Sequence, residues 1–578
     1  MPETRSLPIA AEHRELTVKV GGQPVPREHQ LLSASVSLVA NRIAAARLAY
    51  LDGSAAGGSF ALSASDLFKP GQEIEIAAGA GNRQDVLFKG KVVRHSVKLR
   101  ERSATHLVVE CRHAAMKLTV ARKNANFFDQ SDSDIIEALL GAAGVSAEVE
   151  STRLKHKQVV QFHASDWDFL VARAQANGKL VWPDGDKLVV KAPAVAGATA
   201  CTLQFGATLL EFDAEIDARD QYSAVKAVTW DAAQQQVLTV DGASPGLAGP
   251  GNLSGDDLAG VAAADSLQLR HAALPEAEAQ AWADGAWLGR RLNKVSGRGK
   301  CDGIGSVKPG AVVELAGVGE RFNGKVLVSG VRHEFDQVHG WKTHLQFGGV
   351  PPAAPASLSA PAAGGLVAAV PGLQIGVVTS NEDPDGEHRV RIRLPLVDGG
   401  DDGIWARVAS LDAGDDRGFF FRPEIGDEVV VGFLDDDPRH GVILGMLHSS
   451  AKAAPLQGSD DNHEKLYKSR SGLRLQFNDD KKVMTLDTPA GNSIILSEDD
   501  KSIVLADQNG NKITMNSDGI KIESAKATEI KAGTEAKLES GTSFSAKGGT
   551  ELKLEGGTQA ELSSSAATKV KGGVVQIN

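Results

Sequence analysis

The chain has 578 residues, of which 42% are hydrophobic, and a formal net charge of −11. This length suggests three or four domains, and the hydrophobic share is enough to give each an ordinary core. The negative charge argues against a nucleic-acid or anionic-membrane partner, because either would need a basic face. Short alternating segments recur along the chain, so we expect a mainly β fold with some α-helix.

The sequence lacks the features of a disulfide-rich or signal-bearing protein. The N-terminal stretch MPETRSLPIAAEHRE has no cationic segment followed by a long apolar one, and no run of about 18 apolar residues could span a bilayer. Cys111, Cys201 and Cys301 lie far apart and form no CxxC pair, so we expect three reduced core thiols. We therefore expect assembly in the cytoplasm without a signal peptide, and export only through other proteins.

The N-terminal half mixes strands with a few helices. RELTVKVGGQPV (14–25) predicts two strands joined by a Gly-Gly turn. SDSDIIEALLGAAG (131–144) predicts a short helix with an N-terminal cap and a glycine at its end. SDWDFLVARAQANGKLVW (165–182) predicts a second helix, capped by Ser165 and ended by Gly178.

Two stretches are typical of linkers. Residues 349–371 are rich in Pro, Ala and Gly, and residues 451–472 are polar without clear periodicity. Between them, apolar and polar residues alternate over several short segments, which predicts a small antiparallel β-barrel over 372–450.

The C-terminal region repeats every eight residues from 520 onward. One series of apolar or small residues is Ile522, Ile530, Leu538, Ala546, Leu554, Leu562 and Val570, and a second, two positions earlier, is Ile520, Thr528, Ala536, Phe544, Leu552, Ala560 and Thr568. Residues two apart on a strand face the same side. Each octad is therefore predicted to be a short strand with a two-residue apolar face, followed by a turn that glycine can make.

One chain could not bury this narrow stripe alone. The free energy gained by burying two small side chains per octad is less than the conformational entropy lost by ordering eight residues. The exposed edges of such strands would also promote aggregation. Several chains wound around a shared axis would enclose the stripe and remove the edges. The octads therefore predict oligomerisation, although this reasoning does not choose three chains over two. The alternative is a single-chain β-solenoid, whose rungs generally need more residues and a wider core.

Four linked motifs mark the segment 372–450, and they occur in the order RVRIRLP, WARVA, FRPEIGDEV and DP leading to Gly445. Together they resemble the needle-base OB-fold of VgrG-type spike proteins, which belong to type VI secretion systems, contractile phage tails and extracellular contractile injection systems. The stretch QFHASDWDFLVARAQANG is similar to the helix-entry motif of the hub in this family. VANRIAAARLAYLDG and FKPGQEIEI look most like spikes of the extracellular particles.

The resemblance implies an architecture for the whole chain. In that family the spike is a homotrimer, the hub binds the tail tube, and the octads form an intertwined trimeric β-prism or β-helix needle. The segments expected from it are a first hub β-barrel domain (1–130), an α+β hub segment (131–199), a second hub β-barrel domain (200–348), a linker (349–371), an OB-fold (372–450), a second linker (451–472) and the octad-repeat β-prism needle (473–578).

The resemblance also implies two sets of site residues. The trimer core is expected at Ile522, Ile530, Leu538, Phe544, Leu552, Leu554, Leu562 and Val570. A PAAR-like tip protein is expected to bind Val574, Val575, Gln576, Ile577 and Asn578. The hub would contact tail tube and baseplate proteins, effector cargo is an optional partner, and contact with a target membrane would be transient.

Several residues that could suggest chemistry have a more ordinary explanation. GERFNGKV (319–326) approaches the spacing of a phosphate loop but has Val326 where a hydroxyl should hold magnesium. His333, His339 and His344 lack a cysteine or a helical histidine pair that would complete a metal site. Asp435 to Asp437 lack the ligand spacing of an EF-hand loop. Asp166 and Asp168 lie at a helix start, where carboxylates complement the helix dipole. We therefore expect no catalytic residue, cofactor or metal site.

An OB-fold can bind nucleic acid, but this one has the wrong charge. Residues 372–450 contain 16 Asp and Glu against 7 Arg and no Lys, a net charge of −9. A groove that follows phosphates should be basic and carry stacking aromatic side chains. We therefore expect no nucleic-acid partner.

The sequence thus predicts a non-enzymatic central spike of a contractile injection apparatus, which joins the tail tube to a puncturing tip and pierces a target envelope. About 25 residues separate the OB-fold from the needle, too few for an enzyme domain, and no effector domain is expected after Asn578. The alternatives are a tail-associated cell-wall hydrolase and a receptor-binding tail fibre. The particle type (extracellular, type VI or phage), the target cell and the cargo stay open.

Overall fold

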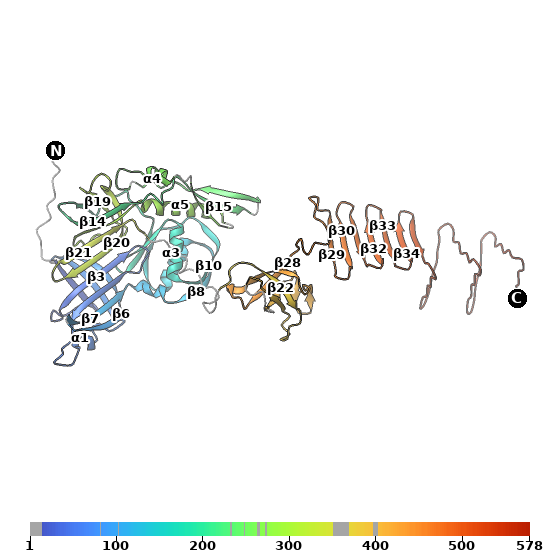
Figure 1. Cartoon of the computed structure of the whole chain (residues 1–578), viewed down its shortest axis with the longest axis horizontal. Helices are drawn as coiled ribbons and strands as arrows, with labels where there is room; N and C mark the ends of the chain where they lie inside the picture. The colour runs from blue at the N-terminus through green and yellow to red at the C-terminus, as the bar shows by residue number, and fades with distance from the viewer. Residues whose placement is uncertain are drawn as a thin grey trace. The chain divides into compact units, whose positions relative to one another are not determined.

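The computed structural model describes residues 14–80, 83–101, 103–231, 234–247, 249–262, 266–271, 274–350, 369–396 and 403–577. It divides into two compact units, which we describe separately (Figure 1). The first contains Met1–Gly372 and Phe433–His440, and the second contains Leu373–Gly432 and Gly441–Asn578. Most of the predicted linker 349–371 lies outside the described residues.

The first unit is built around a sheet of 13 strands. Its N-terminal members are β1 (Arg14–Val20), β2 (Gln23–Pro24), β3 (Leu31–Val39), β4 (Ala45–Leu51), β5 (Glu73–Ala80), β6 (Arg83–Arg100) and β7 (Ser103–Arg112). Its later members are β13 (Cys201–Gln204), β14 (Leu209–Ile216), β18 (Val295–Asp302), β19 (Val312–Ala316), β20 (Gly324–Asp336) and β21 (Gly340–Phe347). Antiparallel pairing of β20 with β3 places Arg332 opposite Ser37 and joins the two groups. The predicted hub domains 1–130 and 200–348 therefore share one sheet, and the boundaries drawn between them stay a prediction.

The Gly-Gly turn predicted at the start of the chain is confirmed. β1 pairs with β2 in antiparallel register, with Val20 opposite Gln23. Gly21 and Gly22 have φ of 57° and 81°, the positive values that a two-residue hairpin turn needs at both central positions.

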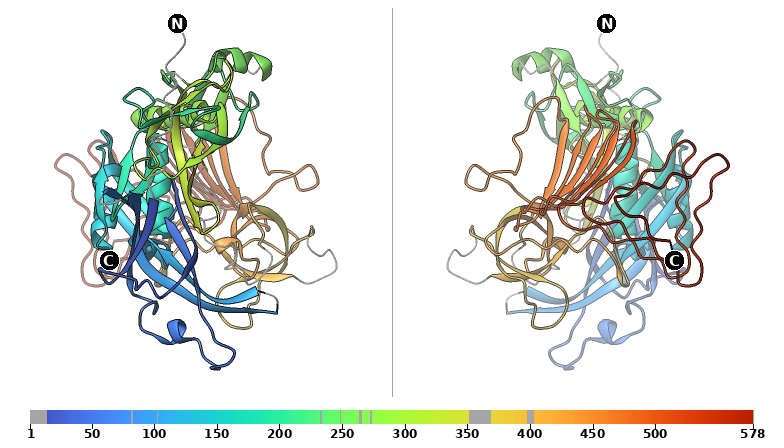
Figure 2. Two further views of the ribbon diagram at one scale, coloured as in Figure 1. Left: turned by 90° about the vertical axis from the view of Figure 1, so that its left-hand side faces the viewer. Right: turned by 90° about the vertical axis from the view of Figure 1, so that its right-hand side faces the viewer.

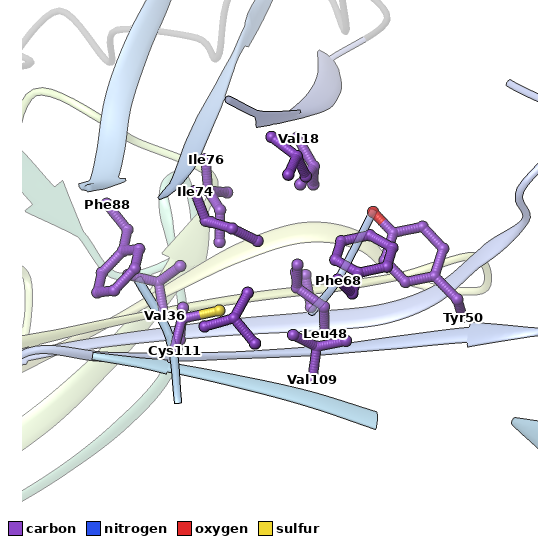
Figure 3. Packing of buried hydrophobic residues seen from close by; sticks show 14 of the residues in the cluster. Val18, Val36, Leu48, Tyr50, Phe68, Ile74, Ile76, Phe88, Val109 and Cys111 are labelled. Atoms are coloured by element: carbon purple, nitrogen blue, oxygen red, sulfur yellow. The ribbon is translucent and has the colours of Figure 1, made fainter. Parts of the chain in front are cut away.

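Alternating sequences place every second side chain of these strands in a core. In β3 and β21 the buried positions alternate with partly exposed ones, as the period of two requires. Figure 3 shows the N-terminal core, whose labelled members are Val18, Val36, Leu48, Tyr50, Phe68, Ile74, Ile76, Phe88, Val109 and Cys111. The rings of Tyr50 and Phe68 lie 4.9 Å apart between centroids. Burial raises the pKa of the Cys111 thiol to about 12, so this cysteine is a protonated core side chain at neutral pH.

The α+β hub segment contains the two predicted helices. Its elements are η1 (Ala114–Thr119), β8 (Arg122–Ser131), α2 (Asp132–Ala142), β9 (Ser146–Val149), β10 (Lys155–Ser165), α3 (Asp166–Ala176), β11 (Leu180–Asp184) and β12 (Lys187–Lys191). Ser131 and Asp134 form a capping box that begins α2. Ser165 Oγ accepts a hydrogen bond from the Asp168 backbone N–H at 3.1 Å and begins α3. α3 ends at Ala176, Asn177 is its C-cap, and Gly178 follows with φ of 65°, so the predicted cap and end are both confirmed.

A further helix packs on a small sheet later in the hub. The elements of this part are β15 (Val225–Asp231), β16 (Gln236–Asp241), α4 (Gly255–Ala262), β17 (Leu267–Arg270) and α5 (Glu276–Leu292). A short helix, α1 (Ala61–Ala64), lies outside this part, between β4 and β5. Ala279, Ala283 and Trp287 of α5 share a core with Val225 and Ala227 of β15. The sequence analysis did not predict α5. Its signal is acidic residues in the first turn and basic residues in the last, which complement the helix dipole.

The barrel predicted over 372–450 is confirmed. Its strands are β22 (Gln374–Ser380), β23 (Val390–Arg393), β24 (Ile404–Val408), β27 (Glu428–Phe433) and β28 (Gly441–Met446), and they close into a ring. Its buried interior comprises Val378, Val390, Ile392, Ala406, Val429, Val431 and Ile443. One pair departs from the predicted antiparallel order, because β24 and β28 run parallel, with Ala406 opposite Gly441. A closed ring with an odd number of strands cannot alternate in direction throughout, so one neighbouring pair has to be parallel.

A seven-stranded sheet follows the barrel in the second unit (Figure 2). Its strands are β29 (Glu464–Lys468), β30 (Arg474–Asn478), β31 (Val483–Asp487), β32 (Ser493–Ser497), β33 (Ser502–Ala506), β34 (Lys512–Asn516) and β35 (Gly519–Glu523). Each strand pairs antiparallel with the next. β29 lies inside the range 451–472 expected to be a linker, so the sheet begins before the predicted start of the needle. The described helices include none with the length and hydropathy of a membrane span.

The N-terminal core generates a first stability prediction. Leu48 is fully buried, whereas Leu51 on the same strand is 41% exposed. We expect Leu48→Ala to lower the free energy of unfolding of the hub by about 2–5 kcal/mol, because it removes buried methyl groups and leaves a cavity. Leu51→Ala is the matched control and should cost less than about 1 kcal/mol. Chemical denaturation followed by tryptophan fluorescence measures both, and equal losses would contradict the core assignment.

Candidate functional site

The seven-stranded sheet has one face made almost entirely of apolar side chains. Directly opposed residues of an antiparallel pair lie on the same face, and so do residues two apart on one strand. The register places Met484 opposite Leu496 and Leu486 opposite Ile494. Following this register from β30 to β35 gives the set that we call the apolar face: Leu475, Phe477, Met484, Leu486, Ile494, Leu496, Ile503, Leu505, Ile513, Met515, Ile520 and Ile522.

The apolar face is uncovered in the single chain. Its side chains are 37% exposed at Met484, 48% at Leu486 and 72% at Ile520. Contiguous apolar patches of this extent on a protein surface mark an interaction site. The opposite face is largely polar, and on it Arg474 and Asp487 form an ion pair across neighbouring strands. The sheet is therefore amphipathic, and its apolar face requires a partner.

Most of the apolar face was not predicted from the sequence, although the sequence contains the pattern that forms it. Pairs of apolar residues two apart recur along the chain, as Leu475 and Phe477 or Met484 and Leu486 show. Their spacing varies between strands because the connecting turns differ in length, so a search for a fixed period of eight does not find them. Ile520 and Ile522 end the apolar face and also begin the octad series, so one apolar stripe continues from the sheet into the repeats.

The predicted trimer-core residues are not brought together within one chain. Ile522 lies on β35, but residues 524–577 contain no strand within the described range, and all of them are exposed (Figure 1). The exposed fractions are 80% for Ile530, 77% for Leu538, 66% for Phe544, 56% for Leu552, 83% for Leu554, 79% for Leu562 and 67% for Val570. The octads form no strand within the described part of the single chain, as expected for a two-residue stripe that needs other chains to cover it, and the strands of an assembled needle stay a prediction. The single-chain solenoid is not formed either, and the role of these residues as a trimer core stays a prediction.

The predicted tip residues are likewise exposed. Val574 is 80% exposed, Val575 is 50% exposed and Ile577 is 92% exposed. Gln576 is also exposed, while Asn578 lies outside the described residues. Their binding of a tip protein stays a prediction.

The histidines that could have suggested a metal site have other partners. His333 is buried in β20, where its Nδ1 lies 3.0 Å from Thr343 Oγ1 and accepts a 3.4 Å hydrogen bond from Trp341 Nε1. His344 Nε2 lies 3.0 Å from Glu334 Oε2, and His339 contacts Asp336. No group of three or more His, Cys, Asp or Glu side chains able to hold a metal ion occurs in the described part of the chain.

The remaining chemical candidates have structural roles. GERFNGKV covers the end of the connection from β19 to β20 and the first residues of β20, so it precedes no helix. Asp166 accepts hydrogen bonds from Lys123 Nζ at 2.5 Å and Gln161 Nε2 at 2.9 Å, next to the Ser165 cap. Asp437 is buried, and its hydrogen bonds from Arg439 lower its pKa to about 2. Its carboxylate fixes the turn that follows η3 (Leu434–Asp436).

The apolar face generates a prediction about assembly. Leu486→Asp places a charge on this face, and an assembled oligomer would have to bury one such charge per chain. We expect association to weaken at least about 100-fold, since an unpaired buried charge costs several kcal/mol. Thr485→Asp, on the opposite face, is the matched control and should leave assembly unchanged. Light scattering of the full chain measures the mass, and an unaltered mass for Leu486→Asp would contradict the assignment.

The buried histidine generates a prediction about pH. Burial, with His344 nearby, lowers the pKa of His333 from 6.5 to about 4, so the unfolded chain binds a proton more readily than the folded one. Stability is therefore complete above pH 6.5 and falls as the pH drops from 6.5 toward 4, by about 2 kcal/mol between pH 7 and pH 5. His333→Gln should reduce this fall, and the exposed His339→Gln should keep it. Urea denaturation at the two pH values measures the difference.

Three family models match the chain. The model described as Alg8 N-terminal domain matches residues 10–337. The type VI secretion system/phage-baseplate injector OB domain matches residues 374–448, which coincide with the closed barrel. The phage baseplate V C-terminal trimerisation domain matches residues 483–540, which contain most of the apolar face. No curated protein matches the chain.

Several solved structures are similar to the chain at low sequence identity and with TM-scores below 0.5. A tail protein from Neisseria meningitidis MC58 is 14% identical, with 58% of this chain and 96% of that chain covered and a TM-score of 0.43. The E. coli c3393 protein, a component of the type VI secretion system, is 14% identical, with coverages of 74% and 99% and a TM-score of 0.38. A chain of the Francisella PdpA-VgrG complex is 9% identical, with 88% of each chain covered and a TM-score of 0.39. These scores are too low to support a function.

The family assignment therefore depends on the matched models. The Alg8 N-terminal domain model covers more than half of the chain, and the OB and trimerisation models match the two parts of the second unit. The predicted resemblance and the mainly β fold class are both confirmed. The chain belongs to the family of the Alg8 N-terminal domain and is a VgrG-type spike protein of the type VI secretion and phage-baseplate class.

Proposed function

We propose that the chain is the homotrimeric central spike of a contractile injection particle, which joins the tail tube to a puncturing tip and pierces a target envelope. The observation that carries this proposal is the apolar face together with the octads that continue it. Both present apolar side chains to solvent in one chain, and a shared axis between chains would bury them.

The proposed mechanism is mechanical and uses no catalysis. Sheath contraction, supplied by other proteins, drives the tube and spike forward, so the needle has to keep its structure under load. In an intertwined needle, one strand cannot leave without breaking its contacts with neighbouring chains, and this gives a high barrier to unfolding. Lys537 and Glu539 flank Leu538 and form an exposed ion pair of 2.6 Å, which suits the outer side of such a needle.

Two contacts with other proteins belong to this proposal. The hub would bind the tail tube and baseplate, and a PAAR-like cone would cover Val574 to Ile577, whose apolar members are exposed. VANRIAAARLAYLDG and FKPGQEIEI resemble the spikes of extracellular, phage-tail-like particles, which favours such a particle without deciding between it and a type VI or phage setting. Effector cargo and a brief passage through the target membrane are part of the same proposal.

Aspartate substitutions in the octads test the proposed needle. Leu538→Asp, Leu554→Asp and Leu562→Asp each place like charges near the shared axis, so we expect loss of a heat-resistant trimer and a fall from threefold to single-chain mass. Lys537→Asp is the matched control, because its side chain would lie outside. Light scattering and gel electrophoresis without boiling measure the outcome, and a heat-resistant trimer of all three leucine variants would refute the inward assignment.

The same purified protein separates the spike from its two alternatives. Peptidoglycan turnover by the full chain would favour a cell-wall hydrolase, and binding to glycans or whole cells would favour a receptor-binding fibre. We expect neither activity and a threefold mass for the wild type.

A further inference from the structure

An exposed aromatic cluster lies where the barrel meets the seven-stranded sheet. Phe419, Phe420 and Phe421 follow the short hairpin of β25 (Ala413–Gly414) and β26 (Arg417–Gly418), and Tyr467 lies on β29. Their exposed fractions are 53%, 76%, 50% and 51%. We call these four side chains the aromatic collar. Each of the four is at least half exposed, so together they present aromatic surface to water.

The collar is ordered by its own ring contacts. The rings of Phe419 and Phe421 stack with centroids 5.8 Å apart, and Phe421 meets Tyr467 edge to face at 5.1 Å. The Arg422 guanidinium lies 5.7 Å from the centre of the Phe420 ring. These aromatic side chains therefore form a defined surface that joins the barrel to the first strand of the sheet.

The collar is continuous with the apolar face. Tyr467 is directly opposite Leu475 of β30, so the two side chains lie on the same side of the sheet. Leu475 is opposite Leu486, the next member of the apolar face. A row of apolar side chains thus runs from Phe421 through Tyr467 into the apolar face without a change of side.

The barrel and the seven-stranded sheet are also joined by a polar contact. Arg470, in the turn between β29 and β30, forms a 3.0 Å ion pair with Glu424 of the barrel. This exposed pair adds little stability by itself, but it acts together with the Phe421–Tyr467 contact between the same two parts. Whatever covers the apolar face next to Tyr467 will therefore also approach the collar.

We propose that the aromatic collar packs against a neighbouring copy of this chain, so that the contact between chains begins on the barrel and not at the first needle strand. This inference depends on the proposed trimer and adds a second, separate interface to it. A second copy is favoured because the collar continues the face that the matched trimerisation domain contains. A membrane is the less suitable occupant, because the segment 412–418 that leads into the collar carries three aspartates against one arginine, and this net negative charge disfavours anionic lipid.

Site-specific photocrosslinking of the full chain tests the collar. The photoreactive residue p-benzoylphenylalanine replaces Phe420 in one variant and Leu396 in the control, which is 84% exposed on the same barrel. After illumination we expect covalent dimers and trimers from the Phe420 position, with adducts that map to the collar or to β29 and β30 of another chain. The Leu396 position should give at least 10-fold less of these products.

The outcomes separate the collar from the trimer itself. A threefold mass by light scattering, with no crosslink between chains at Phe420, would overturn the collar and leave the proposed function standing. A single-chain mass before illumination would overturn the proposed trimer and the collar with it. Crosslinks from Phe420 to added phosphatidylglycerol vesicles, in place of crosslinks between chains, would assign the collar to a membrane and also overturn the inference.

Discussion

The structure depends on the burial of one apolar stripe that a single chain leaves in water. In the hub and the barrel, apolar side chains close on one another within the chain, as Leu48 and Phe68 do in the first sheet. In the last 120 residues or so they do not, and Leu486 and Leu554 stay largely exposed. Water penalises exposed apolar surface in proportion to its area, so the proposed trimer would lower the free energy of this region by covering the stripe with other chains.

The apolar stripe lies on a formed sheet in its first part and on a chain without strands in its second part. From β30 to β35 the chain makes its own hydrogen-bonded ladder, so the backbone is satisfied and only the side chains lack a partner. From 524 to 577 the described chain forms no strand, and its large apolar side chains stay exposed. The first part offers a preformed surface on which copies can associate, and the second requires association before it can gain strands. This order suits a needle that assembles from its base toward its end.

The hub shows the opposite behaviour, because its contacts are long-range within one chain. Pairing of β20 with β3 brings residues about 300 positions apart into one sheet. The capped helices α2 and α3 pack on each other and on Val181 of β11 and Leu188 of β12. The barrel closes in the same self-sufficient way, with one parallel pair imposed by its five strands. Closed domains thus precede a segment that forms no strand from 524 to 577 in the described chain, and this division is consistent with the proposed spike, whose needle would be completed by assembly.

The sequence alone determined the features that depend on local pattern. The caps at Ser131 and Ser165, the Gly-Gly turn, the barrel and the octads all follow from spacing over a few residues, and so does the inference that the octads need other chains. Only the tertiary structure decided which strands are neighbours. Three features depend on which strands pair and in which register, although the turns between those strands differ in length. They are the shared sheet of the hub, the parallel pair of the barrel, and the apolar face with its extension to Tyr467 and Phe421. Register is set by turn lengths and by packing between distant residues, which no local period records.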